Sequence, residues 1–323
     1  MSDIKIGNFI IEGNIWLAPM AGITDMPYRA LCRTQGASFT YTEMVSAKAL
    51  EYKNKNTIPL LQVSKEEGLC ALQLFGSDPE TLANEALKLE EGPYAFFDIN
   101  MGCPVPKIVG NGEGCALMKD PGQVERIIRT MTKVLHKPVT VKIRKGFNEQ
   151  NINAVEIAKV AEGAGAAAVA VHGRTREEYY SGKADWDIIG EVKASVDIPV
   201  IGSGDIYCGK DAADMLRQSG CDGVMVARGA RGNPWIFNNI KQYLETGIEA
   251  DKPSIEEVKE MVLRHAKAEI DFSGEDIAIR QMRKHAAWYS AGYPGSSALR
   301  REINKSCTFK EFEAILTRWA QVD

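Results

Sequence analysis

The sequence has no long apolar run and no paired cysteine motif. No apolar stretch approaches the roughly 20 residues that a helix needs to cross a bilayer, and Met1–Gly7 lack the basic start and apolar run of a secretory signal. The seven cysteines are an odd number without a CxxC pair, which argues against a disulfide scaffold and a zinc site. We therefore expect no membrane association, no metal and a cytoplasmic location.

The chain also lacks the excess of positive charge that is usual in nucleic-acid-binding proteins. It has 39 Lys and Arg against 43 Asp and Glu, a net charge of −4. Between residues 280 and 310, however, the only acid is Glu302, and His285 lies among seven basic residues, namely Arg280, Arg283, Lys284, Arg300, Arg301, Lys305 and Lys310. Such a run is most often a solvated face, so charge alone leaves a nucleic-acid partner open.

The length of 323 residues, with 45% hydrophobic and 25% charged residues, indicates an ordinary globular protein with one large and one small domain. Short β-branched runs alternate with amphipathic stretches between residues 15 and 247. The predicted strands are Ile15–Ala21, Phe39–Met44, Ala71–Phe75, Phe96–Asn100, Val139–Ile143, Ala167–His172, Pro199–Gly202 and Gly223–Ala227. The predicted helices between them include Pro79–Glu91, Pro121–Leu135, Asn153–Glu162, Trp186–Ser195 and Lys210–Gln218.

This alternation predicts parallel strand pairing, and eight strands over this length favour a closed (β/α)8 TIM barrel. An open doubly wound sheet is the rival, although no G-x-G-x-x-G follows the first strand. After Gly247 a linker leads to helical periodicity alone, with Ser254 as the expected cap of the first helix. We expect a catalytic barrel over residues 1–247 and a small all-α helical domain over 248–323. Its expected helices are Ile255–Phe272, Ile277–Ala291, Ser297–Asn304 and Phe309–Gln321.

Polar side chains gather where the predicted strands end, which is where barrel enzymes carry their chemistry. They are Glu43, Gln73, Asn100, Cys103, Lys142, Arg144, His172 and Arg174. Each one alone is more often a buried group that merely bonds to its neighbours. Their convergence on one face, however, is what a cofactor site requires.

Two glycine-containing loops follow the last two predicted strands. They are Ile201–Asp205 and Ala227–Asn233, and the second contains Arg228. Barrels often bind phosphate at this position through exposed backbone N–H groups, and glycine allows a close approach. The loops therefore predict a phosphorylated ligand without naming it.

The segment Asn100–Pro104 places Cys103 on a loop directly after a strand. An ordinary thiol has a pKa near 8.5 and is mostly protonated at neutral pH, so it can donate a proton without a neighbouring base. The alternative is an inert, packed cysteine, the role expected for Cys115.

These motifs resemble those of the tRNA-dihydrouridine synthase family, in particular its bacterial branch. The matching blocks are Ala18–Asp25, Asp98–Pro104, Val141–Arg144, His172–Thr175 and Gly204–Ile206, followed by Arg283–His285 with Trp288 and Tyr289. The resemblance covers nearly the whole chain. It implies an FMN-binding barrel, reduction of the flavin by NADPH or NADH, and a helical domain that helps to hold tRNA.

Carried over position by position, the resemblance implies a role for each matching residue. Pro19, Met20 and Ala21 would line the flavin ring, and Gln73 and Lys142 would bond to its polar edge. The phosphate end would contact His172, Ser203, Gly204, Asp205, Ala227 and Arg228. Cys103 would donate the proton, and substrate contacts would come from Asn100, Arg174, Arg283, Lys284 and His285. Ser203 and Ala227 depart from the family's usual Asn and Gly, which puts their side-chain contacts in question.

Other functions stay open on the residues alone. A flavin barrel acting on a free pyrimidine, such as a dihydroorotate or dihydropyrimidine dehydrogenase, would share the phosphate loops and the loop cysteine. A non-redox lyase or isomerase acting on a sugar phosphate, or an RNA-binding protein without catalysis, is more distant. No obligate protein partner is expected.

Overall fold

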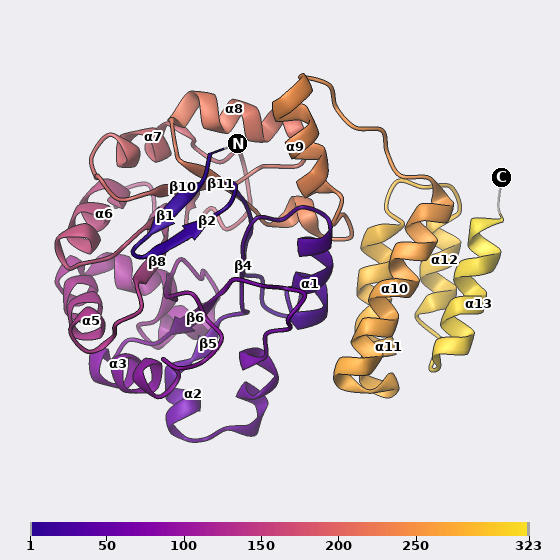
Figure 1. Cartoon of the computed structure of the whole chain (residues 1–323), viewed down its shortest axis with the longest axis horizontal. Coiled ribbons are helices and arrows are strands. Elements are labelled where there is room, and N and C mark those ends of the chain that lie inside the picture. Colours follow the sequence, from indigo (N-terminus) through magenta and orange to yellow (C-terminus); the bar gives the residue numbers. More distant parts are fainter. Residues whose placement is uncertain (1, 322–323) are drawn as a thin grey trace.

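The computed structural model describes residues 2–321, and it places a closed barrel beside a group of C-terminal helices (Figure 1). The wall has eight parallel strand positions, the second being shared by two short strands. In order they are β3 (Ile15–Leu17), β4 (Thr40–Tyr41) with β5 (Val45–Ser46), β6 (Cys70–Phe75), β7 (Phe97–Met101), β8 (Val139–Gly146), β9 (Val169–Thr175), β10 (Val200–Ser203) and β11 (Gly223–Val226).

The wall closes between its first and last strands. β11 pairs with β3 in parallel, and on the other side of β3 the Leu17 N–H donates to the Phe39 carbonyl at 2.9 Å. The predicted (β/α)8 barrel is therefore confirmed, and the open doubly wound sheet is excluded.

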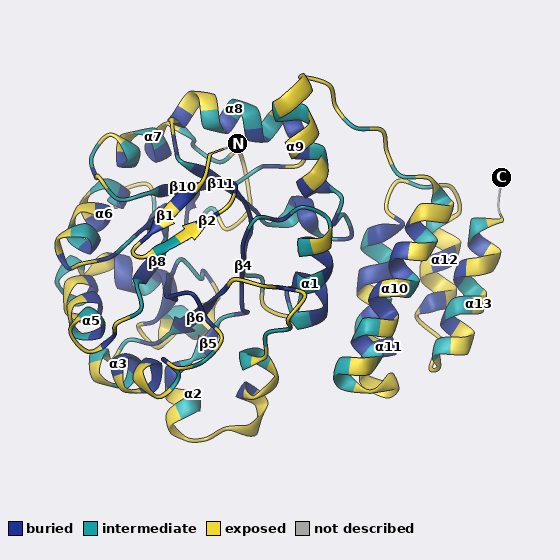
Figure 2. Cartoon of the chain, viewed as in Figure 1, coloured by how far each residue is buried: buried dark blue, intermediate teal, exposed yellow. Residues whose placement is uncertain are grey.

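Helices cover the outside of the barrel. They are α1 (Met26–Thr34), α2 (Ala47–Glu51), α3 (Pro79–Lys88), α4 (Pro106–Gly110), α5 (Pro121–Val134), α6 (Ala154–Gly163), α7 (Asp187–Lys193), α8 (Gly209–Ser219) and α9 (Ile236–Thr246). Asp78 and Asp120 cap α3 and α5, because each carboxylate accepts a backbone N–H of the first turn and a proline follows. Figure 2 shows the buried sides of these helices turned toward the strands.

An N-terminal hairpin that is not among the predicted elements closes one end of the barrel. Strands β1 (Ile4–Ile6) and β2 (Phe9–Ile11) are antiparallel, and their isoleucines pack with Trp16, Phe39 and Phe96 inside the barrel. Ile4 also lies close to Gly223, where β11 begins. The hairpin therefore covers the end at which the strands start and leaves their C-terminal ends open for a site.

Four helices follow the barrel within the described residues: α10 (Ile255–Ser273), α11 (Glu275–Tyr289), α12 (Ser296–Ile303) and α13 (Phe309–Ala320). Ser254 caps α10 in a reciprocal arrangement with Glu257, as predicted. α10 and α11 pack against α1, where the Tyr28 ring stacks on His265 with centroids 5.0 Å apart. The division into two domains at residue 247 stays a prediction. Across residues 2–321, no helix is both long and apolar enough to cross a bilayer.

Candidate active site

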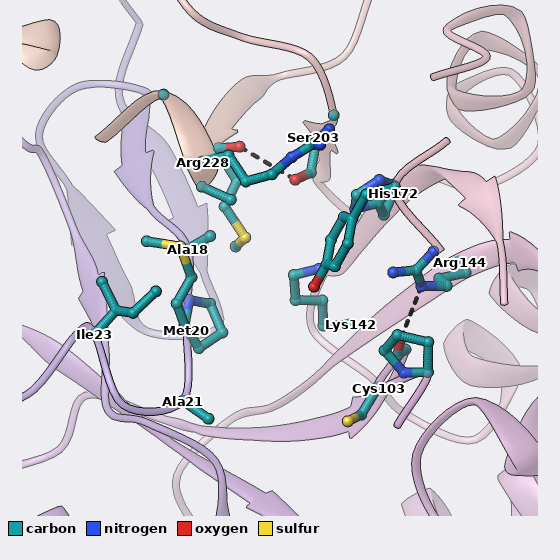
Figure 3. A pocket seen from close by; sticks show the side chains of 18 of the residues that line it. Ala18, Met20, Ala21, Ile23, Cys103, Lys142, Arg144, His172, Ser203 and Arg228 are labelled. Carbon is teal, nitrogen blue, oxygen red and sulfur yellow. Dashed lines mark hydrogen bonds between the residues drawn. The ribbon is translucent and has the colours of Figure 1, made fainter. Parts of the chain in front are cut away.

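A pocket of about 440 Å³ opens at the C-terminal ends of the strands (Figure 3). Its size falls within the usual range for ligand sites. The lining comes from the loops after β3, β7, β9, β10 and β11, from Met44 between β4 and β5, and from the ends of β8 and β9. The predicted site residues that line it are Pro19, Met20, Ala21, Asn100, Cys103, Lys142, His172, Ser203, Gly204, Asp205, Ala227 and Arg228.

A chain of buried hydrogen bonds lies under the pocket and leads to the cysteine loop. Asp98 accepts from the Thr140 hydroxyl at 2.6 Å and from the Gln73 amide at 2.7 Å. The Gln73 oxygen in turn accepts from Asn100 Nδ2 at 2.8 Å, and Asn100 Oδ1 accepts the Cys103 N–H at 2.9 Å. Because both ends of each amide are used, their orientations are fixed, and so is the loop that they support.

Cys103 is half-buried, and its thiol points into the open space that faces Ala21 (Figure 3). Arg144 fixes the loop from the other side by donating from Nε to the Gly102 carbonyl at 2.9 Å. Burial raises the pKa of the Cys103 thiol, although the Val105 N–H and the charges of Arg144 and Lys142 oppose this. The thiol is therefore protonated at neutral pH and available as a proton donor.

Lys142 reaches into the pocket from β8, opposite the loop that follows β3 (Figure 3). Burial, together with the nearby charge of Arg144, lowers its pKa to about 8, while Asp98 opposes the shift. At neutral pH the ammonium is still mostly charged. It is therefore a buried cation placed where negative charge could be stabilised.

His172 is a buried imidazole with an unused nitrogen. Its Nε2 has no hydrogen-bond partner among residues 2–321. Burial, assisted by the charges of Lys142 and Arg144, lowers the pKa of His172 well below its ordinary value, so the ring is neutral. A buried polar atom without a partner costs free energy, and a ligand at this end of the pocket would satisfy it.

Asp205 joins three of the loops around the pocket. Its carboxylate accepts two bonds from Arg174, at 2.9 and 2.7 Å, one from Arg228 at 2.8 Å and one from the Ala184 N–H at 2.7 Å. Although burial opposes it, the Arg174 and Ala184 hydrogen bonds hold the pKa of Asp205 below its usual range. Asp205 is thus an ionised anchor for the arginines.

Arg228 is held on its other faces by aromatic rings. Its guanidinium lies 4.9 Å from the Tyr180 ring centre and 5.7 Å from that of Tyr207. Cation–π contacts and the Asp205 bond together fix the position of this charge at the pocket rim.

Two predicted site residues lie just outside the pocket. Gln73 is fully buried beneath it, between Asp98 and Asn100, so it acts there by holding Asn100. Arg174 is also buried, and its guanidinium is taken up by Asp205, Ser181 and Gly182. Direct contacts of either side chain with ligand stay predictions.

The predicted residues of α11 lie away from the pocket lining. Arg283 donates to the Ser306 carbonyl at 2.6 Å, and Lys284 is exposed and donates to the Gly22 carbonyl of the loop after β3. His285 is buried against Tyr28 and His265, with ring centroids 5.6 and 4.7 Å away. The structure therefore gives His285 a packing position between barrel and helices, and its contact with substrate stays a prediction.

Several lining residues had no assigned role in the sequence analysis, among them Arg144, Tyr180 and Tyr207. Arg144, which donates to the Gly102, Thr175 and Tyr179 carbonyls, was noted only as a strand-end group. Tyr180 and Tyr207 lie in the loops after β9 and β10 and line the pocket. Their place after strand ends was a usable signal, because barrel loops at that end carry the site.

The fold and the pocket together define a TIM-barrel enzyme with its site at the C-terminal ends of the strands. The model of the family described as "Dihydrouridine synthase (Dus)" matches residues 16–322. The chain therefore belongs to the dihydrouridine synthase family, and it is an oxidoreductase.

Curated relatives match almost their whole length. A probable tRNA-dihydrouridine synthase of Rickettsia conorii is 43% identical over 93% of this chain and 91% of its own. A tRNA-dihydrouridine synthase B of Pseudomonas putida is 39% identical over 94% of this chain and 90% of its own.

Solved structures share the fold at low identity. A 2-naphthoyl-CoA reductase aligns with a TM-score of 0.60 at 11% identity, covering 75% of this chain and 51% of that one. An old yellow enzyme homologue from Zymomonas mobilis aligns with a TM-score of 0.51 at 13% identity, covering 78% of this chain and 94% of that one. These likenesses support the barrel fold.

Proposed function

We propose that the protein is an FMN-dependent tRNA-dihydrouridine synthase. It would reduce the C5=C6 bond of specific uridines in tRNA, with NADPH or NADH as the source of electrons. The observation that carries the proposal is the Cys103 thiol, protonated and fixed by Asn100 and Arg144 so that it faces the open pocket. The printed names of the relatives point to the same substrate.

The residues that line the pocket offer the groups that FMN requires, which supports the proposal. Pro19, Met20 and Ala21 offer an apolar wall for the flavin ring, and Lys142 offers a cation for its polar edge. Gly204 has a φ of +122°, a conformation that favours glycine and lets the backbone approach a phosphate closely. Arg228 supplies a fixed positive charge beside this loop.

The two departures from the family pattern are compatible with this fit. The Ser203 hydroxyl donates to the Met225 carbonyl at 3.2 Å, so the side chain is used within the barrel wall. Ala227 has no polar side chain and would offer only backbone. At both positions the contribution to phosphate binding would come from the main chain.

When bound, the reduced flavin would supply a hydride to C6 of the uracil. Cys103 would give its proton to C5, and Asn100, which supports the cysteine loop, would hold the base beside it. Lys142 would stabilise the negative charge that develops on the base before protonation. His172 would stay neutral and bond to the cofactor through its free nitrogen.

The target base must leave the RNA stack to reach this pocket. Exposed basic side chains of the helical segment, Arg280, Lys284, Arg300, Arg301 and Lys305, are the candidates for phosphate contacts. Lys284 is also bonded to Gly22, which places one of these charges beside the pocket loop. Contacts with the RNA backbone would be strongly salt-dependent.

Anaerobic mixing of the reduced protein with unmodified tRNA tests the proposal directly. We expect rapid reoxidation of the flavin together with dihydrouridine in the recovered RNA. Reoxidation by a free pyrimidine but not by tRNA would show that the substrate is a free pyrimidine and not tRNA. A purified protein that neither carries flavin nor takes up added FMN would overturn the assignment of FMN as the cofactor.

A further inference from the structure

A second polar cluster lies away from the pocket, between the barrel and the C-terminal helices. It consists of Asp25, in the loop after β3, and of His265 and Glu269 on α10. One ligand atom from each side chain lies within 4.8 Å of the other two. Because His265 and Glu269 are four residues apart on one helix, they project from the same face.

The cluster has unused bonding capacity. Glu269 is 0% exposed, and neither of its carboxylate oxygens has a hydrogen-bond partner among the described residues. His265 is also 0% exposed, and its Nε2, 3.4 Å from Glu269 Oε1, is likewise unpartnered there. Burying an ionised carboxylate without a partner is costly, so this group needs either a cation or a proton shared with Asp25.

Carboxyl groups outnumber the cations that act on the cluster. Glu43 lies near the cluster, and Lys284 is the cation whose charge acts on both Glu43 and Glu269. The guanidinium of Arg29 also acts on Glu43 and Asp25, but it is already paired with Glu67. The three carboxyl groups of Asp25, Glu43 and Glu269 thus share the ammonium of Lys284, which favours uptake of a further cation.

His265 is placed to be a nitrogen ligand. Its ring is fully buried, and its Nε2 faces Glu269 inside the cluster. The Tyr289 hydroxyl lies 3.4 Å from its other nitrogen, Nδ1. In the tautomer that carries its proton on Nδ1, the ring donates to the Tyr289 oxygen and leaves the Nε2 lone pair toward Glu269, the arrangement found behind metal-binding histidines.

We propose that Asp25, His265 and Glu269 bind one divalent transition-metal cation. One imidazole nitrogen and carboxylate oxygens form a donor set suited to Mn²⁺ or Zn²⁺. Asp25 Oδ1 already accepts the Tyr28 N–H at 3.1 Å, which leaves Oδ2 for the metal. Cysteine spacing gave no sign of this site, because its ligands lie about 240 residues apart in the sequence.

The cation would fasten the helical segment to the barrel. Asp25 caps α1 and follows directly on the pocket loop, whereas His265 and Glu269 belong to α10. The metal would therefore hold the loop of Met20 and Ala21 against the C-terminal helices. Its role is structural and does not depend on the reaction proposed above.

Metal binding by the full-length protein, with any affinity tag removed, tests the proposal. After dialysis against a chelator, Mn²⁺ is added and followed by electron paramagnetic resonance, since Mn²⁺ avoids thiols such as the exposed Cys307. We expect one Mn²⁺ per chain, and a melting temperature raised by about 5 °C at a hundredfold excess over Kd. Glu269→Gln and Asp25→Asn should abolish both effects.

Glu260→Gln is the matched control, because Glu260 is exposed on the same helix and should leave both effects intact. Where Glu269→Gln does not fold, His265→Gln replaces it. A parent protein that binds no Mn²⁺ and no Zn²⁺ would overturn the proposal, and the cluster would then be a carboxyl pair sharing a proton. Full binding by both Glu269→Gln and Asp25→Asn would overturn it as well.

Discussion

The two ends of the barrel differ in the polarity of their side chains. At the N-terminal end the β1–β2 hairpin packs Ile6 and Ile11 onto Trp16 and Phe96, all of them buried. At the C-terminal end polar and charged groups face the pocket beside an apolar wall, and His172 Nε2 has no partner among residues 2–321. The first end contributes apolar burial and the second leaves bonding capacity for a ligand. Stability and chemistry are thereby separated along the barrel axis.

The same strands supply both ends. On β9, Ala170 and His172 are two residues apart and so point the same way. Ala170 joins the apolar cluster above the hairpin, and His172 lines the pocket. The inward-facing side of β9 thus changes from apolar at Ala170 to polar at His172, and the pocket begins at this point of the strand.

The largest effect is expected at the C-terminal end, from Cys103→Ala. Without the thiol the uracil has no proton donor, so its reduction should slow by about 10²- to 10⁴-fold. The melting temperature and flavin content should stay close to those of the parent, because Cys103 is only half-buried. Single-turnover mixing with tRNA measures the rate, and an unchanged rate would remove Cys103 from the mechanism.

A change at the N-terminal end should have the converse result. Ile11→Ala removes a buried side chain from the β1–β2 hairpin and should lower the free energy of unfolding by about 2–4 kcal/mol. Ile10→Ala is the matched control, since Ile10 is 62% exposed and should cost less than about 0.5 kcal/mol. Denaturant unfolding measures both changes. Equal losses of unfolding free energy at the two positions would contradict the stabilising role of the β1–β2 hairpin.

Arg228→Ala should weaken cofactor binding without unfolding the protein. It removes a fixed positive charge from the predicted phosphate end of the pocket, which should raise the Kd for FMN about ten- to a hundredfold. Titration of the flavin-free protein by fluorescence measures this. Arg217→Ala, on the exposed face of α8, should leave the Kd unchanged. A Kd unaltered in both variants would place the phosphate elsewhere.

The smallest effect is a pH dependence from Lys142. Its lowered pKa of about 8 means that the ammonium is charged at pH 7 and mostly neutral at pH 9. Uracil reduction should therefore fall roughly tenfold between these values. The raised pKa of the Cys103 thiol acts in the opposite direction, since it favours the protonated form of that group. The rate of uracil reduction by Lys142→Met should be lower than that of the parent and nearly independent of pH. A rate that does not change with pH in the parent would refute this role of Lys142.

The sequence predicts the barrel well because its strands and caps are local features. The predicted helix 121–135 is observed as Pro121–Val134, and Asp120 caps it. The β1–β2 hairpin escaped prediction because its strands are only three residues long, although Gly7-Asn8 between them was a recognisable turn signal.

The site could be predicted as a set of strand ends but not as a network of partners. Nothing near Gln73 in the sequence shows that Asp98 and Asn100 use both ends of its amide. Arg174 likewise turns inward because Asp205, from a different loop, meets it. Such pairings depend on the closure of the barrel, and local patterns do not encode them.

The anchoring of three loops by one carboxylate would also set how quickly the proposed cofactor can leave. Since Asp205 joins Arg174, Ala184 and Arg228, none of these loops can swing outward alone without breaking a charged bond. Their backbone amides should exchange hydrogen for deuterium together, as one cooperative opening unit. The residence time of the proposed cofactor would then be governed by the frequency of that single opening.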